Sequence, residues 1–218
     1  MMNLNYFNVS SLDMKVMSSY LTEDCLKSLK EKYLFNRDVL LSGGGRILLK
    51  YTLSKLGIDS YTITIDDNGK PYLENYPNIH FNISHSDKFV LVGVSDENIG
   101  LDIEKAQDLD YEGISKNFFH SIEHEYIIGS KNPIDTFFKI WTVKESYVKM
   151  KGAGIANLKS FIYTLERNII QDTEENQIGD VKLKTWKLNN YYVSVCSKED
   201  VTTEPEEILL SSINNQLK

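Results

Sequence analysis

The sequence predicts an α+β protein with two halves of similar design, each with helices packed on a small antiparallel sheet and with a cleft between them. Along the 218 residues, stretches with the apolar spacing of helices come before stretches with the alternation of strands. This order occurs twice, and the change falls near residues 105 to 112. We therefore place an N-terminal half at residues 1–105 and a C-terminal half at residues 106–218.

Composition limits the classes of function. The formal charge of −7 argues against a general nucleic-acid-binding protein, which needs a basic face to displace phosphate counterions. Two distant cysteines, Cys25 and Cys196, fit neither a disulfide framework nor a zinc site. No apolar run approaches the roughly eighteen residues that cross a bilayer, and the first residues lack a signal-peptide pattern. We expect a cytoplasmic protein that does not enter membranes.

Two helical patterns open the first half. Residues 21–37 carry apolar residues at helical spacing, with Thr22 as a possible N-cap. Gly43, Gly44 and Gly45 then precede a second pattern that ends at Gly57. The glycine triplet lacks the spacing and the lysine of a phosphate-binding P-loop, so we interpret it as a flexible joint between the two patterns.

The next stretches of the first half have the apolar and polar patterns of β-strands. Residues 61–65 and 70–73 flank an Asn-Gly turn that predicts a hairpin, with Pro71 at a sheet edge. Residues 79–104 contain three apolar runs joined by short polar connections, which predict an antiparallel meander. Asp102 and Glu104 share one face of the third run. Such a pair is either a solvated acidic edge or a site for a divalent metal, and the pattern leaves both open.

The second half begins with a helical pattern at residues 115–129, which carries Glu123. His120 and His124, four residues apart on it, have no third ligand in view and favour surface positions over a metal site. The stretch 137–150 predicts a helix with Trp141, Glu145 and Lys149 along a face that its apolar stripe does not use. Taken alone, Glu145 and Lys149 are equally well explained as a solvated ion pair.

Strand patterns occupy residues 161–165, 181–188 and 191–197, the last two joined by a turn at Asn189 and Asn190. We expect a loop at 168–180, and a short helix or a frayed end after residue 199. Together, the acidic pair, the helix face and the turn at His85 suit phosphoryl chemistry. Asp102, Glu104 and Glu145 are then the expected metal ligands, with Lys149 and His85 as phosphate contacts.

Five motifs, taken in their order along the chain, resemble those of a known protein family. They are Gly69-Lys70-Pro71, FNISHS at 81–86, IGLDIEK at 99–105, the Phe118 to Glu123 segment, and the Trp141 to Lys149 segment. This series, covering about residues 69 to 155, resembles the 4′-phosphopantetheinyl transferases of the surfactin-synthetase-activating type. The resemblance implies a monomer of two pseudo-symmetric halves that moves phosphopantetheine from coenzyme A to a serine of an apo acyl or peptidyl carrier protein and releases 3′,5′-ADP.

The resemblance also assigns roles. It implies that Asp102, Glu104 and Glu145 bind Mg²⁺, with Mn²⁺ as an alternative metal. It implies that Glu145 or Glu123 accepts the serine proton, directly or through a water.

For coenzyme A, the resemblance implies that Lys149 contacts the pyrophosphate and that Ser84 and His85 hold the phosphates. Gly69, Lys70 and Pro71 border the adenine in the same comparison.

One departure concerns the 3′-phosphate of coenzyme A. Family members usually carry an arginine just before the small residues that open the second helix, and this chain has Leu41 there. Arg37, Arg46, Lys30 and Lys32 are the available substitutes. Two other functions remain open: a metal-dependent phosphohydrolase that uses the same carboxylates on another pyrophosphate, and a carrier-protein-binding module without catalysis.

Overall fold

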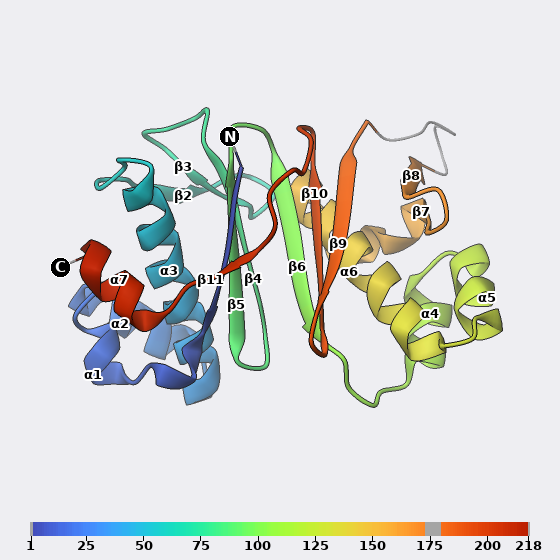
Figure 1. Cartoon of the computed structure of the whole chain (residues 1–218), viewed down its shortest axis with the longest axis horizontal. Coiled ribbons are helices and arrows are strands. Elements are labelled where there is room, and N and C mark those ends of the chain that lie inside the picture. Colours follow the sequence, from blue (N-terminus) through green and yellow to red (C-terminus); the bar gives the residue numbers. More distant parts are fainter. Residues whose placement is uncertain (1, 173–179, 218) are drawn as a thin grey trace.

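Two small sheets lie side by side in the middle of the molecule, and each carries its helices on its outer side (Figure 1). The computed structural model describes residues 2–172 and 180–217. Its first part comprises β1 (Asn3–Asn8), η1 (Val9–Ser11), α1 (Met14–Met17), α2 (Glu23–Lys32), α3 (Asn36–Lys55), β2 (Ile63–Ile65), β3 (Pro71–Leu73), β4 (His80–Ser86), β5 (Phe89–Ser95) and β6 (Ile99–Lys105). Its second part comprises α4 (Tyr111–Phe118), α5 (Ser121–Gly129), α6 (Pro133–Lys151), η2 (Ile155–Ser160), β7 (Phe161–Thr164), β8 (Ile169–Asp172), β9 (Lys182–Leu188), β10 (Tyr191–Ser197), β11 (Glu206–Glu207) and α7 (Leu210–Leu217).

The two main sheets are joined by side chains instead of a continuous ladder. One has the strand order β11-β1-β5-β4 and the other β6-β10-β9. A buried apolar cluster that includes Leu4, Leu91, Leu101 and Val193 draws on both sheets. The α+β fold with two helix-covered halves is therefore as predicted. No helix in the described ranges combines the length and the apolar character needed to cross a bilayer.

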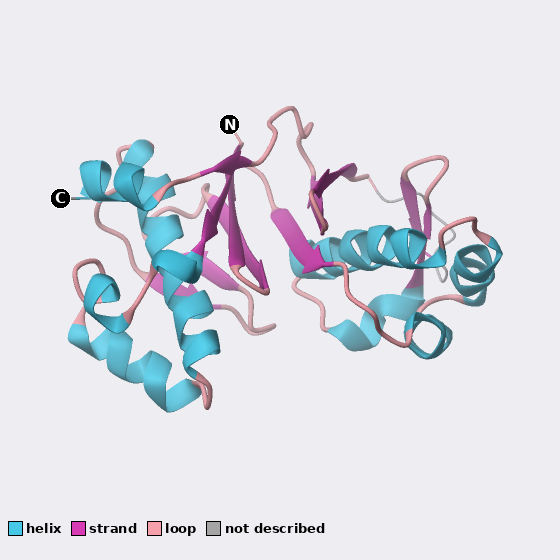
Figure 2. Ribbon diagram, turned by 60° about the horizontal axis from the view of Figure 1, so that its bottom comes forward, coloured by secondary structure: helices cyan, strands magenta, loops and turns pink. Residues whose placement is uncertain are grey.

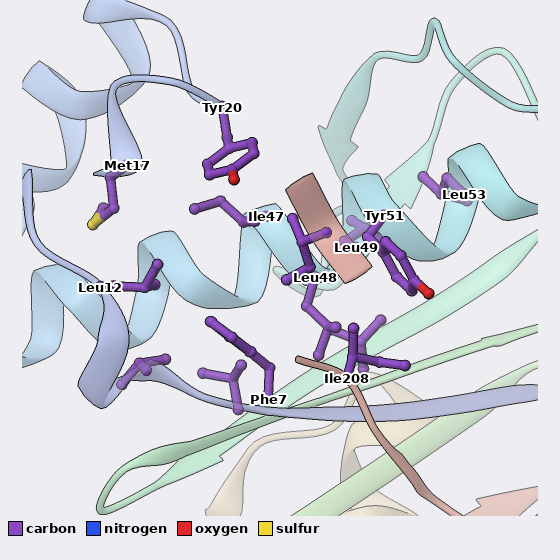
Figure 3. Packing of buried hydrophobic residues seen from close by; sticks show 14 of the residues in the cluster. Phe7, Leu12, Met17, Tyr20, Ile47, Leu48, Leu49, Tyr51, Leu53 and Ile208 are labelled. Carbon is purple, nitrogen blue, oxygen red and sulfur yellow. The ribbon is translucent and has the colours of Figure 1, made fainter. Parts of the chain in front are cut away.

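The glycine triplet is not a joint, and that prediction was wrong. Helix α3 runs without a break through Gly43, Gly44 and Gly45, and it packs on the first sheet (Figures 1 and 3). A Cβ added at Gly43 would lie 2.0 Å from Cε of Met17, and one at Gly44 would lie 2.5 Å from Cγ1 of Val9. The glycines therefore allow neighbouring segments to approach the helix axis closely, which compensates for their poor helix propensity.

The remaining core of this half surrounds the second part of α3. Ile47, Leu48 and Leu49 are fully buried there, and Figure 3 shows them beside Phe7 and Ile208. The predicted helix at 21–37 is shorter in the structure, because α2 ends at Lys32 and is followed by the exposed Leu34 and Phe35. Strand β1 was not predicted, since its two buried residues are three positions apart and do not alternate.

The predicted three-strand meander is correct only for its first two strands. β4 and β5 pair as an antiparallel hairpin, whereas β6 pairs with β10, with Asp102 opposite Ser194. The hairpin of β2 and β3 around the Asn-Gly turn is confirmed, and Gly69 has a φ of 85° there. A strand can present the same alternation to any neighbour, so the sequence did not specify the partner of β6.

In the second half, the predicted helix at 115–129 is two helices, with a break at Phe119 and His120 (Figure 2). Phe119 is 1% exposed, and His120 is the N-cap of α5. The predicted strands β7, β9 and β10 and the helix α6 are confirmed. The prediction of a loop at 168–180 was wrong where β8 forms, at Ile169–Asp172. Residues 173–179 of that predicted loop lie outside the described ranges.

The chain returns to the first half after β10. Strand β11 runs parallel to β1, with Asn5 opposite Glu206, and helix α7 follows it. Ile208 and Ile213 complete the core around α3. The division of the chain between residues 105 and 106 stays a prediction. In the structure, β6 precedes this division but pairs with β10 in the sheet of the second half. Helix α7 follows it in sequence but packs on the core of the first half.

Candidate active site

The site is built where β4 and β6 run alongside each other, although they belong to different sheets. Alternate side chains of β4 accept hydrogen bonds from backbone N–H groups of β6. Asn82 Oδ1 accepts from Leu101 at 3.1 Å, and Ser84 Oγ and Ser86 Oγ accept from Ile103 at 3.4 Å and Lys105 at 3.1 Å. We call this row of three side-chain-to-backbone bonds the seam. It sets the register between β4 and the carboxylates of β6.

Asp102 is the most enclosed of these carboxylates, with 2% of the residue exposed. Its Oδ1 accepts hydrogen bonds from Ser84 Oγ at 2.8 Å and from the Lys149 ammonium at 2.6 Å. Its Oδ2 is buried and has no hydrogen-bond partner among the described residues. A buried ionised oxygen without a partner is costly, so this atom is suited to a cation or a donor from a bound molecule.

Glu104 and Glu145 complete a group of three carboxylates. Glu104 Oε2 accepts from Ser86 Oγ at 2.8 Å, and burial together with the Asp102 carboxylate raises the pKa of Glu104 to about 7. Burial and Asp102 also raise the pKa of Glu145, which is 7% exposed and projects from α6. Glu145 Oε1 is a second buried oxygen without a partner in the described part of the chain. Neither predicted pair is a solvated surface feature.

This group fits a hard divalent cation only in part. Within residues 2–172 and 180–217, no three His, Cys, Asp or Glu side chains are already arranged as a metal cage. The Lys149 ammonium lies against Asp102 and offsets some of the negative charge. Mg²⁺ commonly takes only one or two protein carboxylates and completes its shell with water and phosphate oxygens. The two unpartnered oxygens, on Asp102 and Glu145, therefore fit such an ion.

Basic groups surround the carboxylates. Lys149 Nζ lies 3.0 Å from Ser84 Oγ, so Ser84 joins the lysine to Asp102. His85 follows on β4, and desolvation and the nearby Lys149 ammonium lower the pKa of its imidazole. The His85 ring is therefore neutral at neutral pH in this state, and an anion placed beside it would favour its protonation.

A cavity of about 390 Å³ adjoins the ends of β6 and α6. Lys70 and Pro71 line it, together with Tyr72, Ile79, His80 and Phe81, whereas Gly69 shapes the turn beside it. The Lys70 ammonium donates to the backbone oxygens of Met150 at 2.8 Å and Ile99 at 3.3 Å. It also contacts Asn98 Oδ1, and burial lowers its pKa to about 8. Lys70 thus ties the β2–β3 hairpin to the C-terminal end of α6.

Glu123 does not share a hydrogen bond with this group of carboxylates. Its two oxygens each lie 2.8 Å from the Lys144 ammonium, and they also accept from the backbone N–H groups of Tyr163 and His120. Both side chains of the pair are buried, at 0% and 1% exposure. Lys144 also donates to the Phe161 carbonyl at 2.8 Å. The pair connects α5, α6 and β7 in the second half.

Sequence reasoning missed Lys144 and Ser86. Lys144 was visible only as a cation on the apolar stripe of α6, between Ile140 and Tyr147, where a buried partner is required. Ser86 had no signal beyond its alternation with Ser84 along β4.

The structure also shows the contacts of Arg37 and Arg46, two of the basic residues that could substitute for the arginine expected at the position of Leu41. Leu41 is buried at 4% exposure. Arg37 donates to Asp87 at 3.0 Å, in the turn that follows His85 and Ser86. The Arg46 guanidinium lies 2.8 Å from the Cys25 sulfur, away from that turn.

Comparisons with known proteins give two matches to family models and several curated relatives. The family model of the 4′-phosphopantetheinyl transferase superfamily matches residues 98–196, and that of the 4′-phosphopantetheinyl transferase N-terminal domain matches residues 7–97. The chain is 30% identical over 179 residues to the 4′-phosphopantetheinyl transferase Sfp of Bacillus subtilis, with 76% of this chain and 80% of that protein aligned.

Two further relatives extend the comparison. The 4′-phosphopantetheinyl transferase psf-1 of Bacillus pumilus is 28% identical over 87% of this chain and 86% of its own length. The 4′-phosphopantetheinyl transferase gsp of Aneurinibacillus migulanus is 39% identical over 57% of this chain, and the match spans 53% of that protein. The boundary between the two family models falls just before β6, the strand that carries Asp102 and Glu104. The chain belongs to the 4′-phosphopantetheinyl transferase superfamily.

Proposed function

We propose that this protein transfers the 4′-phosphopantetheine group of coenzyme A to a serine of an apo acyl or peptidyl carrier protein and releases 3′,5′-ADP. The observation that carries the proposal is the group of Asp102, Glu104 and Glu145 with Lys149. A separate cavity lies between the β2–β3 hairpin, the start of β6 and the C-terminal end of α6. The names of the relatives supply the type of group transferred. A monomeric state and a cytoplasmic location remain predictions from the sequence.

Coenzyme A would be held by the elements around this cavity. We assign its adenine to the space bordered by Lys70 and Pro71, with Gly69 fixing the turn. Ser84, His85 and Lys149 are the proposed phosphate contacts, because all three lie within the same cluster.

Arg37 is the proposed contact for the 3′-phosphate. It reaches the turn after His85, whereas Arg46 is bound to Cys25 and lies elsewhere. Lys30 and Lys32 are exposed on α2 and remain the alternative.

The carboxylates would serve two purposes. Asp102, Glu104 and Glu145 would hold Mg²⁺, or Mn²⁺ in its place, and the bound ion would supply positive charge for the pyrophosphate. Glu145 is the proposed base for the serine hydroxyl, because burial and Asp102 raise its pKa and its second oxygen, Oε2, remains for the proton when Oε1 meets the ion. Glu123, the other candidate base, has both oxygens bound to Lys144 and backbone N–H groups.

In the proposed reaction, the serine oxygen forms a bond to the phosphorus that carries pantetheine. The bond from that phosphorus to the bridging oxygen breaks, and 3′,5′-ADP leaves with the electron pair. The serine proton passes to Glu145. Lys149 keeps its positive charge next to Asp102 and stabilises the charge on the phosphates, so most of the catalysis comes from positioning and electrostatics.

Intact-mass spectrometry of an apo carrier protein, incubated with this protein, coenzyme A and Mg²⁺, tests the proposal. We expect the carrier to gain the mass of one phosphopantetheinyl group, and EDTA to abolish the gain. If coenzyme A is consumed with metal but no carrier gains mass, the phosphohydrolase replaces the transferase. If neither changes with any of several carriers, the chain is a binding module.

A further inference from the structure

The seam contains two serines that make the same pair of hydrogen bonds, and only one of them lies in the cluster of basic groups. Ser84 accepts from the backbone N–H of Ile103 and donates to Asp102. Ser86 accepts from the backbone N–H of Lys105 and donates to Glu104 at 2.8 Å. Each hydroxyl therefore accepts a hydrogen bond from the backbone of one β6 residue and donates a hydrogen bond to the carboxylate of the residue just before it.

This arrangement fixes which oxygen of each carboxylate remains available. Ser84 and Lys149 take Oδ1 of Asp102, and Oδ2 is left without a partner among the described residues. Ser86 takes Oε2 of Glu104, and no other side chain in the described part of the chain hydrogen-bonds to this carboxylate. Glu104 has a longer and more flexible side chain than Asp102, so its orientation depends more on that single bond.

We propose that Ser86 is a positioning residue that orients Glu104 toward the divalent metal. This inference rests on the proposed function, since it assumes that Glu104 is a metal ligand. The Ser86 hydroxyl holds Oε2, which leaves Oε1 as the oxygen available to an ion, and the Glu104 carboxylate interacts electrostatically with those of Asp102 and Glu145. Hydrogen bonds from a second layer of side chains commonly orient metal-binding carboxylates in this way, and their loss weakens metal affinity about 10- to 100-fold.

The test compares Ser86→Ala and Ser86→Thr with the wild-type chain. Ser86→Ala removes the hydroxyl, whereas Ser86→Thr keeps it. Ser95→Ala is the matched control, because Ser95 at the end of β5 also donates to a carboxylate, that of Glu199, and that carboxylate lies outside the site. Thermal unfolding of each variant reports the cost of the seam bond to Lys105 separately from any effect on metal.

Three readouts apply to all four proteins. Binding of Mn²⁺ to the metal-free protein is followed by the electron paramagnetic resonance signal of free Mn²⁺. The Mg²⁺ concentration for half-maximal carrier modification is then measured, together with the KM for coenzyme A. We expect Ser86→Ala to weaken Mn²⁺ binding and raise the Mg²⁺ requirement about tenfold. The KM for coenzyme A at saturating Mg²⁺ should stay unchanged, Ser86→Thr should restore most of the affinity, and Ser95→Ala should match the wild type.

Equal metal affinity in Ser86→Ala and the wild type would overturn the positioning role while leaving the proposed function intact. A rise in the KM for coenzyme A with unchanged Mn²⁺ binding would overturn it too, and would assign Ser86 to substrate binding. A wild-type chain that shows no metal-dependent transfer would instead refute the proposed function, and the role of Ser86 with it.

Discussion

Two lysines of helix α6 each pair with a carboxylate on another element, Lys144 with Glu123 on α5 and Lys149 with Asp102 on β6, and the two pairs differ in almost every other respect. Lys144 and Glu123 are both buried, at 0% and 1% exposure, and both oxygens of Glu123 are bound. The Lys149 side chain is 28% exposed, and its partner Asp102 keeps one buried oxygen that has no hydrogen bond to any described residue. We refer to these as the closed pair and the open pair.

The difference teaches how one helix can serve both stability and chemistry. In the closed pair, every donor and acceptor is used within the chain, so the charges serve to connect α5 and β7 to α6. In the open pair, Asp102 Oδ2 is buried and has no hydrogen-bond partner within the described residues, which is a common feature of sites that bind a ligand. The following three tests separate the two roles.

The largest effect is expected from Asp102→Asn in the open pair. This change removes the negative charge but keeps the shape, so the chain should fold and bind Ser84 as before. We expect carrier modification at saturating coenzyme A to fall at least about a thousandfold, equivalent to about 4 kcal/mol. The rate is measured by intact-mass spectrometry, with circular dichroism as the folding control. Near-normal activity of this variant would show that Asp102 is not a metal ligand.

The next effect is expected from Lys144→Met in the closed pair. The change leaves the Glu123 carboxylate buried without its counter-charge, which typically costs about 3 to 5 kcal/mol of unfolding free energy. Urea denaturation measures this loss, and Lys149→Met is the matched control. That control should lose less stability, because Lys149 is partly exposed and Asp102 retains its bond from Ser84.

The double variant Glu123→Gln with Lys144→Met sharpens the same test. Removing both charges should recover part of the stability that Lys144→Met loses. If Lys144→Met and Lys149→Met are equally stable, the distinction between the closed and open pairs is wrong.

The smallest effect is a pH dependence that comes from Glu104, whose carboxylate interacts with that of Asp102 in the open pair. The pKa of Glu104 is raised to about 7 in the folded, metal-free chain, from an ordinary value of 4.5. Between these values the folded state binds more protons than the unfolded state, so this group's stabilisation is complete below about pH 4.5 and declines as pH rises to about 7. As pH rises from about 4.5 to about 7, the melting temperature of Glu104→Gln should therefore fall less than that of the wild type.

Mg²⁺ provides the complementary measurement. Because the ion competes with the proton on Glu104, its stabilisation of the wild type should be larger at pH 8 than at pH 5. The measurement is the melting temperature with and without Mg²⁺ at both values of pH. An equal shift at both would indicate that Glu104 does not bind the ion.

Much of this arrangement was accessible from the sequence because it depends on local periodicity. The spacing of Glu145 and Lys149 on α6 placed both on one side of a helix, and the alternation along β6 placed Asp102 with Glu104. The partner of β6 was not accessible, since pairing with β10 is a contact between distant segments. Lys144 was missed because a buried cation makes sense only when Glu123 is known to face it, and the tight packing at Gly44 depends likewise on a distant Val9.

The position of β11 and α7 has a consequence for how the molecule is made. A ribosome delivers residues 206–213 after β9 and β10, yet Ile208 and Ile213 fill the core around α3, which was synthesised much earlier. While the second half is being synthesised, the outer edge of β1 in the first half therefore has no β11 strand paired with it. The first sheet is thus complete only after Glu206 has been synthesised and pairs with Asn5, and β6 pairs only after β10 has been synthesised, with Tyr191 opposite Lys105. The two halves are expected to reach their final state together in one cooperative step.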